Sequence, residues 1–185
     1  MPFWDKFFGD SRKREEENTD EQPVPQGPWE RFAHNFTQNN GKFLLAHSDD
    51  EIKELLQKIL DYENADEFWA YEQTIKSRYL QHLPHSDSSQ PRPDHIFLGN
   101  ARYLLENAGG ILFTSYETGD FRLIDLPRTM VFLAEPDRLV PSKEKAMEHI
   151  NSALRNAYPA HIHSIKNFSP RGNDFSKNVY LILKA

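Results

Sequence analysis

Cysteine is absent from this sequence of 185 residues. The chain therefore forms no disulfide bond, and it cannot itself hold an iron–sulfur cluster through cysteine thiolates. We accordingly predict no cofactor in this chain. Freedom from disulfides is also compatible with a cytoplasmic location.

Long apolar runs are absent as well. Hydrophobic residues make up 38% of the chain, and the mean hydropathy is -0.74. No run approaches the roughly 20 apolar residues that a membrane-spanning helix needs. Near the N-terminus Asp5 and Lys6 interrupt the apolar cluster, so a secretory pattern is missing. These features predict a cytoplasmic protein without a transmembrane segment.

Positive charge is not in excess. The 22 Lys and Arg residues are outnumbered by 28 Asp and Glu residues, which gives a net charge of -6. Proteins that bind nucleic-acid phosphates usually present a concentrated basic face. We therefore predict no nucleic-acid partner, and the sequence leaves the oligomeric state open.

The first 27 residues differ in composition from the rest. Residues 9–27 lack periodicity, and residues 10–21 hold six acidic and three basic side chains. We predict a disordered tether here. It follows an aromatic face, which either docks on the protein's own surface or contacts a partner or membrane. This face comprises Phe3, Trp4, Phe7 and Phe8.

Residues 28–185 alternate between helical and strand patterns. The serine and glutamate of the run SDDE at 48–51 predict a capped helix start. Helices are predicted from 28, from 48, over 73–83 and over 142–158. Strands are predicted at 42–46, 67–71, 111–114, 129–134, 161–165 and 178–183. This alternation predicts one three-layer α/β domain with a mainly parallel sheet. Its predicted sheet core contains Phe43, Leu45, Ile111, Phe113, Val131, Leu133, Tyr180 and Ile182.

The stretch 100–127 organises the domain. It begins with an apolar run, for which we predict helix up to residue 108. Gly109 and Gly110 then allow a change of chain direction and close approach of backbone. A β-prone run follows, and a polar loop ends at Leu126 and Pro127.

Four segments follow one another along the chain: ENAGG at 106–110, LP at 126–127 before TMVFLA, LVPS at 139–142, and FSPRGND at 168–174 before NVYLIL. In this order they resemble motifs of the LUD-domain family, in particular its LutC type. The match spans roughly residues 30–185 and is best over the last ninety. The resemblance implies a fold like that of the NagB, RpiA and CoA-transferase group.

That resemblance implies an accessory or interaction protein of L-lactate utilisation, in which lactate is oxidised to pyruvate. Iron–sulfur partner subunits would then carry the electrons. The alternative is a small-molecule enzyme of the acyl- or CoA-transferase type acting on a carboxylate substrate. Its candidate catalytic residue is Glu106, since a carboxylate can serve as a nucleophile. An ungapped alignment, however, places Asn107 where the family has its glutamate.

A ligand site is predicted from the two loops at 107–110 and 169–174. Each precedes a predicted strand, so a parallel sheet would bring both loops to one edge. Glycine backbone N–H groups bind anions, and an arginine fork suits a small carboxylate or phosphate. A competing geometry uses Thr118, Asp120 and Arg122 at the opposite edge. The predicted ligand-binding residues are Asn107, Gly109, Gly110, Arg171, Gly172, Asn173 and Asp174.

Two groups of histidines are the remaining candidates for metal ligands. His161 and His163 lie two apart and would share one face of a strand, which is a common ligand geometry. His82, His85 and His95 bracket a polar loop that is expensive to order. Acidic residues are lacking beside the first pair, so we predict structural or surface roles and no metal site.

Deletion of residues 1–9 tests the role of the aromatic face. We expect the melting temperature to change little, while association with a partner or membrane falls. A loss of several degrees in thermal melts would show instead that these aromatic side chains belong to the core.

Overall fold

The computed structural model describes residues 27–153, 157–169 and 176–185. The aromatic face and residues 9–26 of the tether therefore lie outside the described residues, and the division into two regions stays a prediction. Among the residues described, no helix has both the length and the apolar character required to cross a membrane.

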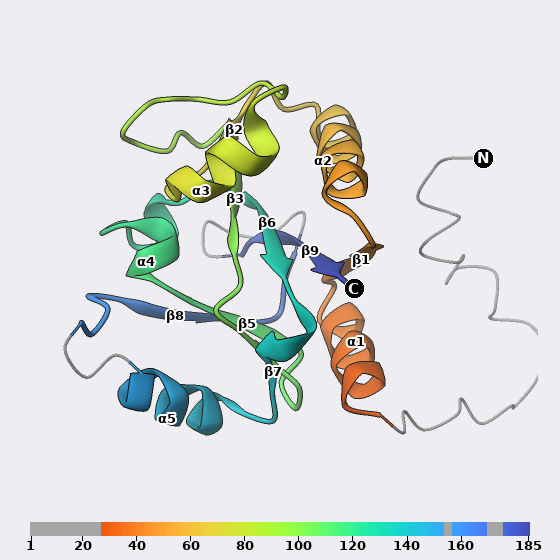
Figure 1. Cartoon of the computed structure of the whole chain (residues 1–185), viewed down its shortest axis with the longest axis vertical. Coiled ribbons are helices and arrows are strands. Elements are labelled where there is room, and N and C mark those ends of the chain that lie inside the picture. The colour runs from red at the N-terminus through yellow and green to blue at the C-terminus, as the bar shows by residue number, and fades with distance from the viewer. Residues whose placement is uncertain (1–26, 154–156, 170–175) are drawn as a thin grey trace, which may run out of the picture.

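Five parallel strands form the principal sheet, in the order β1-β9-β6-β3-β2 (Figure 1). Register along the middle of the sheet pairs Leu98 with Val131, and Val131 with Tyr180. The predicted α/β fold with a mainly parallel sheet is confirmed. The strands are β1 (Lys42–Ala46), β2 (Phe68–Trp69), β3 (Ile96–Asn100), β6 (Thr129–Ala134) and β9 (Asn178–Lys184).

One face of this sheet is covered by α2 (Asp49–Glu63) and by α3 (Gln73–Ile75) with its π-helical extension η2 (Lys76–Leu80). Ser48 caps α2 by accepting a hydrogen bond from the Glu51 backbone N–H at 3.1 Å. The Glu51 carboxylate reaches back to the His47 N–H at 2.7 Å. The predicted helix start is thus confirmed.

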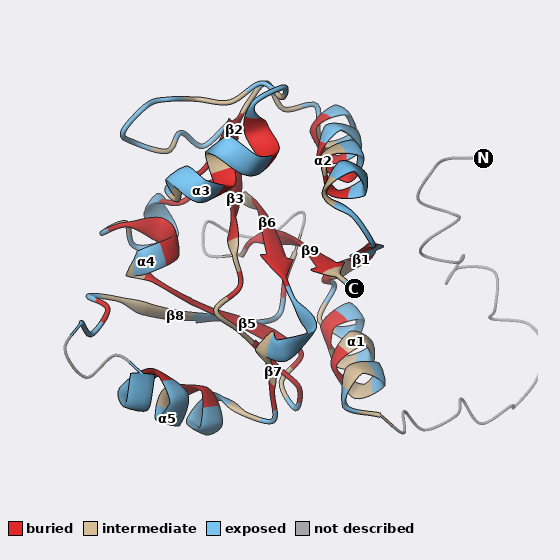
Figure 2. Ribbon diagram, in the orientation of Figure 1, coloured by how far each residue is buried: buried red, intermediate tan, exposed pale blue. Residues whose placement is uncertain are grey.

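The opposite face is covered by α1 (Pro28–Gln38) and by a second sheet. This sheet has the order β7-β4-β5-β8, and α5 (Lys143–Ala153) packs on its far side (Figure 2). Its strands are β4 (Tyr103–Leu105), β5 (Gly110–Thr114), β7 (Leu139–Val140) and β8 (Ile162–Ile165). Short helical turns complete the chain: α4 (Ser115–Thr118), η3 (Leu123–Asp125) and η4 (Pro136–Arg138).

The helix predicted up to residue 108 is wrong. This run closes β3 at Asn100 and then forms β4, which pairs antiparallel with β5 and parallel with β7. A short apolar run fits a buried strand as well as a helix, so its tertiary partners decided the outcome.

The predicted core is partly confirmed. Val131, Leu133, Tyr180 and Ile182 are buried between the parallel sheet and α2. Ile111 and Phe113 are buried too, but they belong to the second sheet. Phe43 is partly buried near α1. Leu45 is 47% exposed, and its prediction is wrong because it lies on an edge strand.

The turn between β4 and β5 fastens α1 to the domain. The Asn35 side chain donates to the Glu106 carbonyl at 3.0 Å, and the Asn39 side chain donates to the Ala108 carbonyl at 2.7 Å. Gly109 has a φ of +54°, and an added Cβ would lie 2.3 Å from the Asn35 carbonyl carbon. Glycine is required here by conformation and by contact.

Substitution Gly109→Ala should therefore lower the free energy of unfolding by at least about 2 kcal/mol, since overpacking and a left-handed backbone each cost about 1–3 kcal/mol. Urea unfolding measures this loss. Gly27→Ala is the control, because its added Cβ would have its nearest neighbour at 4.0 Å. Equal stability of the two variants would contradict the proposed role of the turn.

Candidate functional site

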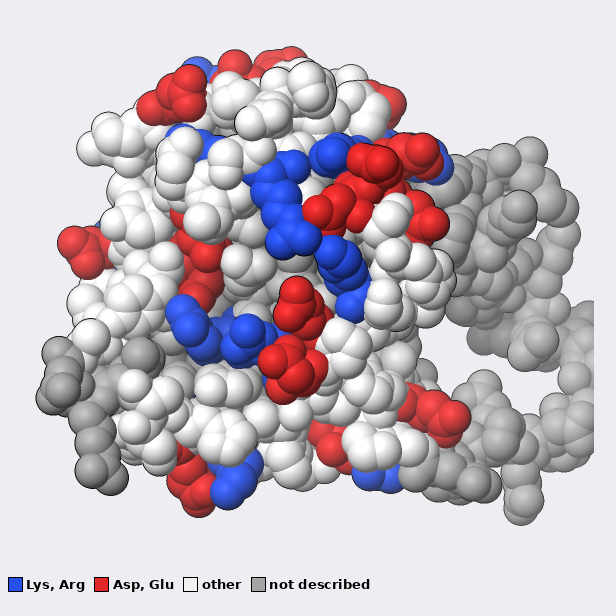
Figure 3. Space-filling model, in the orientation of Figure 1, with Lys and Arg blue, Asp and Glu red and all other residues white. Residues whose placement is uncertain are grey.

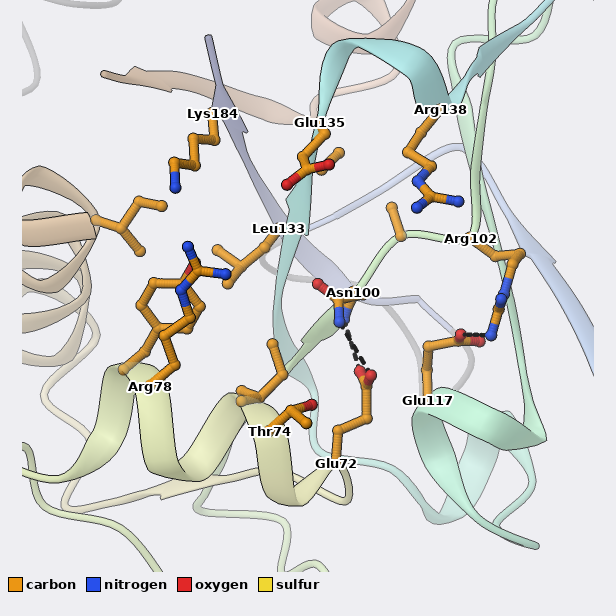
Figure 4. A pocket seen from close by; sticks show the side chains of 15 residues that line it. Glu72, Thr74, Arg78, Asn100, Arg102, Glu117, Leu133, Glu135, Arg138 and Lys184 are labelled. Carbon is orange, nitrogen blue, oxygen red and sulfur yellow. Dashed lines mark hydrogen bonds and ion pairs between the residues drawn. The ribbon is translucent and has the colours of Figure 1, made fainter. Parts of the chain in front are cut away.

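A pocket of about 300 Å³ lies where β3, β6 and β9 end. Ligands of open α/β sheets bind beyond the carboxyl ends of the strands, so this is the expected place for a site. The strands deliver Asn100, Glu135 and Lys184 to it, and Figure 4 shows these side chains around a common space. The other polar residues that line the pocket are Glu72, Thr74, Arg78, Tyr79, Arg102, Glu117 and Arg138.

On one side of the pocket Asp49 holds two cations. Its carboxylate accepts from Arg78 Nε at 2.7 Å and from Lys184 Nζ at 2.7 Å. The hydrogen bond from Arg78, and next that from Lys184, lowers the Asp49 pKa from 3.8 to about 2. Asp49 is the first residue of α2, where the helix dipole also favours negative charge. The two cations are thereby held at fixed positions beside the cavity.

On the opposite side Glu117 holds Arg102. Glu117 is the third residue of α4, and its carboxylate accepts from the Thr114 N–H at 2.7 Å and from the Thr114 hydroxyl at 2.8 Å. It also forms an ion pair with Arg102, whose guanidinium lies 5.5 Å from the centre of the Tyr116 ring. The Arg102 Nε is buried without a hydrogen-bond partner among the described residues.

Between these pairs, Glu72 is bound to the end of β3 (Figure 4). Its two carboxylate oxygens accept from the Asn100 backbone N–H at 3.1 Å and from the Asn100 side-chain amide at 2.9 Å. Burial raises the pKa of Glu72, and the hydrogen bonds from Asn100 oppose that rise. This carboxylate is therefore a fixed acceptor.

The remaining charges come from the turn after β6. Glu135 is the N-cap residue of η4 and Arg138 is its last residue, and Figure 4 shows both side chains directed toward the pocket. Arg138 lies 3.4 Å from Asp137 and its side chain is 41% exposed. In the space-filling view, basic and acidic side chains lie side by side around the middle of this face (Figure 3). The pocket thus has a mixed rather than a uniform charge.

Glu106 has a different environment. It is 7% exposed, and its carboxylate lies 2.7 Å from the Arg31 guanidinium. It does not line the pocket. This geometry ties the turn between β4 and β5 to α1.

The two loops of the predicted ligand site lead into different sheets. Residues 107–110 lead into β5 of the second sheet, which begins at Gly110, whereas the later loop precedes β9 in the parallel sheet. The premise of one shared sheet edge is therefore wrong. Asn107 and Gly109 belong to the turn that receives α1, and Gly110 begins β5. Ligand binding by these three residues stays a prediction. Arg171, Gly172, Asn173 and Asp174 lie outside the described residues.

The competing site residues Thr118, Asp120 and Arg122 do not come together around one cavity either. Thr118 is buried, and its hydroxyl donates to the Thr114 carbonyl at 3.1 Å. Asp120 is exposed, and Arg122 forms an ion pair with Asp125 at 2.8 Å. Neither side chain lines the pocket, although Glu117 from the same stretch does.

The histidines do not gather around a common point. His161 and His163 stack with ring centres 6.1 Å apart, and His95 lies 3.6 Å from Glu67. Among the described residues, no group of three or more His, Cys, Asp or Glu side chains could hold a metal ion.

Most residues of the pocket were missed in the sequence. Glu135 and Lys184 could have been predicted as site residues, since each directly follows a predicted strand. The Thr114-to-Glu117 spacing of a capping box was a second signal. The role of Asp49 could not be read, because its partners are 29 and 135 positions away along the chain.

Comparison with known proteins supplies a fold relationship. No family model matches this chain, and no curated protein matches it in sequence. The fold is similar to the crystal structure of a DUF162 family protein from Deinococcus radiodurans, with a TM-score of 0.64. That similarity covers 87% of this chain and 100% of the other, at 15% sequence identity.

Replacement Asp49→Asn should reduce stability in a pH-dependent way. The folded-state pKa is depressed, so the contribution of Asp49 is present above its ordinary pKa of 3.8 and is lost as pH falls through about 2. The difference in unfolding free energy from wild type should therefore shrink over that range. Denaturant unfolding at stepped pH measures it.

Asp50→Asn is the matched control. Asp50 lies in the same helical turn, but its side chain is 86% exposed and pairs only with Lys53 at 2.9 Å among the described contacts. We expect a smaller change in stability for this variant. Identical pH profiles for the two variants would show that the contacts of Asp49 with Arg78 and Lys184 contribute nothing.

Proposed function

We propose that this chain is a LUD-type domain that binds a small carboxylate- or phosphate-bearing metabolite and serves as an accessory protein of L-lactate utilisation. The protein with the similar fold is a DUF162 family protein, and DUF162 is the LUD domain family. The order of the four sequence motifs supports the same assignment. Iron–sulfur partner subunits would carry electrons, because this chain has no cysteine.

The observation that carries the ligand-binding part is the set of cations fixed at the carboxyl edge of the sheet. Arg78 and Lys184 share the carboxylate of Asp49, so each retains further N–H donors. Arg138 adds a planar fork, which matches a carboxylate or phosphate in a bidentate manner. The volume of about 300 Å³ lies at the lower end of the range for ligand pockets, and so favours a small metabolite.

The accessory role is favoured over the transferase alternative by the environment of Glu106. A carboxylate nucleophile must reach the substrate, whereas this one is bonded to Arg31 and lies outside the pocket lining. Covalent catalysis by Glu106 would require that ion pair to break.

Arg138→Ala should weaken binding of L-lactate, pyruvate or phosphate by about tenfold or more, equivalent to about 1.4 kcal/mol. The side chain is partly exposed, so the fold should tolerate the change. Isothermal titration calorimetry measures the affinities. Arg122→Ala is the control, since this exposed arginine lies outside the pocket.

Loss of binding in Arg122→Ala, with full binding in Arg138→Ala, would move the site to the loop near residue 122. Absence of binding to wild type would remove the ligand from the proposal. Copurification with cysteine-rich iron–sulfur proteins tests the accessory role separately, and its failure would leave only the ligand-binding part.

A further inference from the structure

We infer that Glu72 determines the specificity of the pocket by accepting a hydrogen bond from a hydroxyl group on the bound anion. The inference rests on the proposed function, because it presumes an anion in this pocket. It adds a ligand class: carboxylates or phosphates that carry a hydroxyl, in preference to the corresponding deoxy compounds.

The first argument is the fixed position of Glu72. It is the N-cap residue of α3, and Asn100 holds it from the last position of β3. A backbone N–H and a side-chain amide of that one residue occupy one lone pair on each carboxylate oxygen. A carboxylate offers about four acceptor positions, so about two remain. Glu72 lines the cavity, and Figure 4 shows its carboxylate amid the surrounding charges.

The second argument is the cost of leaving these positions without a donor. Glu72 is partly withdrawn from water, and Asn100 stabilises its ionised form. A ligand that fills the pocket displaces the remaining water. If that ligand lacks a donor, the carboxylate loses hydration without compensation. Sites built around such a polar group reject analogues that cannot complete the hydrogen bond.

The third argument concerns the charge balance around Glu72. Arg78, Arg102, Arg138 and Lys184 line the pocket together with Glu117 and Glu135, and Glu117 and Arg102 act on Glu72 in opposite senses. Arg78 and Lys184 are paired with Asp49, and Arg102 is paired with Glu117. A hydroxyl donates the hydrogen bond that Glu72 can accept without changing this balance, whereas an ammonium group adds a positive charge to it. The anionic end of the ligand can then lie toward the cations, as their arrangement around Glu72 in Figure 4 allows.

The experiment compares matched ligands by isothermal titration calorimetry. L-lactate, propionate and L-alanine differ only in the group on carbon 2. For phosphates, glycerol 3-phosphate, which carries two hydroxyl groups, is compared with propyl phosphate, which carries none. We expect wild type to prefer the hydroxylated member of at least one pair by about tenfold or more. The pair that shows the preference identifies the anion as carboxylate or phosphate.

In Glu72→Gln the affinities for the hydroxylated and the deoxy ligand should become nearly equal, since an amide replaces one acceptor oxygen by a donor. Glu144→Gln is the matched control, because it makes the same replacement on α5, outside the pocket lining, and should leave the preference unchanged. Thermal melts of both variants establish that they are folded. Should Glu72→Gln not fold, Glu72→Asp replaces it, and the shortened carboxylate should reduce the preference.

Equal binding of L-lactate and propionate, and of the two phosphates, would overturn the inference while leaving the anion site intact. Tighter binding of L-alanine than of L-lactate would overturn the choice of a hydroxyl. A preference that survives in Glu72→Gln would assign it to another residue. Failure of every ligand to bind wild type would overturn the proposed ligand site, and the inference with it.

Discussion

Parallel pairing of β6 with β3 and β9 is the constraint on which the rest of the structure depends. Side chains of β6 alternate between two cores: Val131 and Leu133 face α2, while Met130 and Phe132 face the second sheet. A strand buried on both faces has one register that satisfies both cores. Since the strands are parallel, that same register brings their carboxyl ends, and the polar residues there, to one edge.

Local patterns predicted most of the fold because hydrophobic period and capping chemistry act over a few residues. The β6 strand and the α2 helix are examples. The prediction that Leu45 is buried is wrong, because the exposure of a residue on an edge strand depends on which other elements cover that strand. The helix predicted up to residue 108 is wrong because this run forms β4, and the partners of β4 are β5 and β7, which lie later in the chain. The ligand site was predicted in loops that precede strands. The pocket instead lies beyond the carboxyl ends of the strands, among side chains that only folding brings together.

The glycine turn illustrates how a motif can have a structural use. A backbone that approaches closely was predicted from Gly109, and close approach does occur, but the neighbour is α1. Asn35 and Asn39 satisfy its carbonyls, and Arg31 balances the buried Glu106. Asn39 also accepts from the Phe168 N–H at 2.8 Å, which links the turn to the segment before the last loop. The glycine thus supports packing of a helix.

The balance of positive and negative side chains in the pocket determines how it can recognise a ligand. Arg78, Lys184 and Arg102 are already opposed by Asp49 and Glu117, so these cations exert little net field at a distance. The pairs of Asp49 with Arg78 and Lys184 are partly exposed, and such pairs add little to stability. Their main effect is to fix donors and acceptors in place before a ligand arrives, which lowers the entropic cost of binding. Recognition here therefore depends on short-range hydrogen bonds of defined direction, and much less on overall charge.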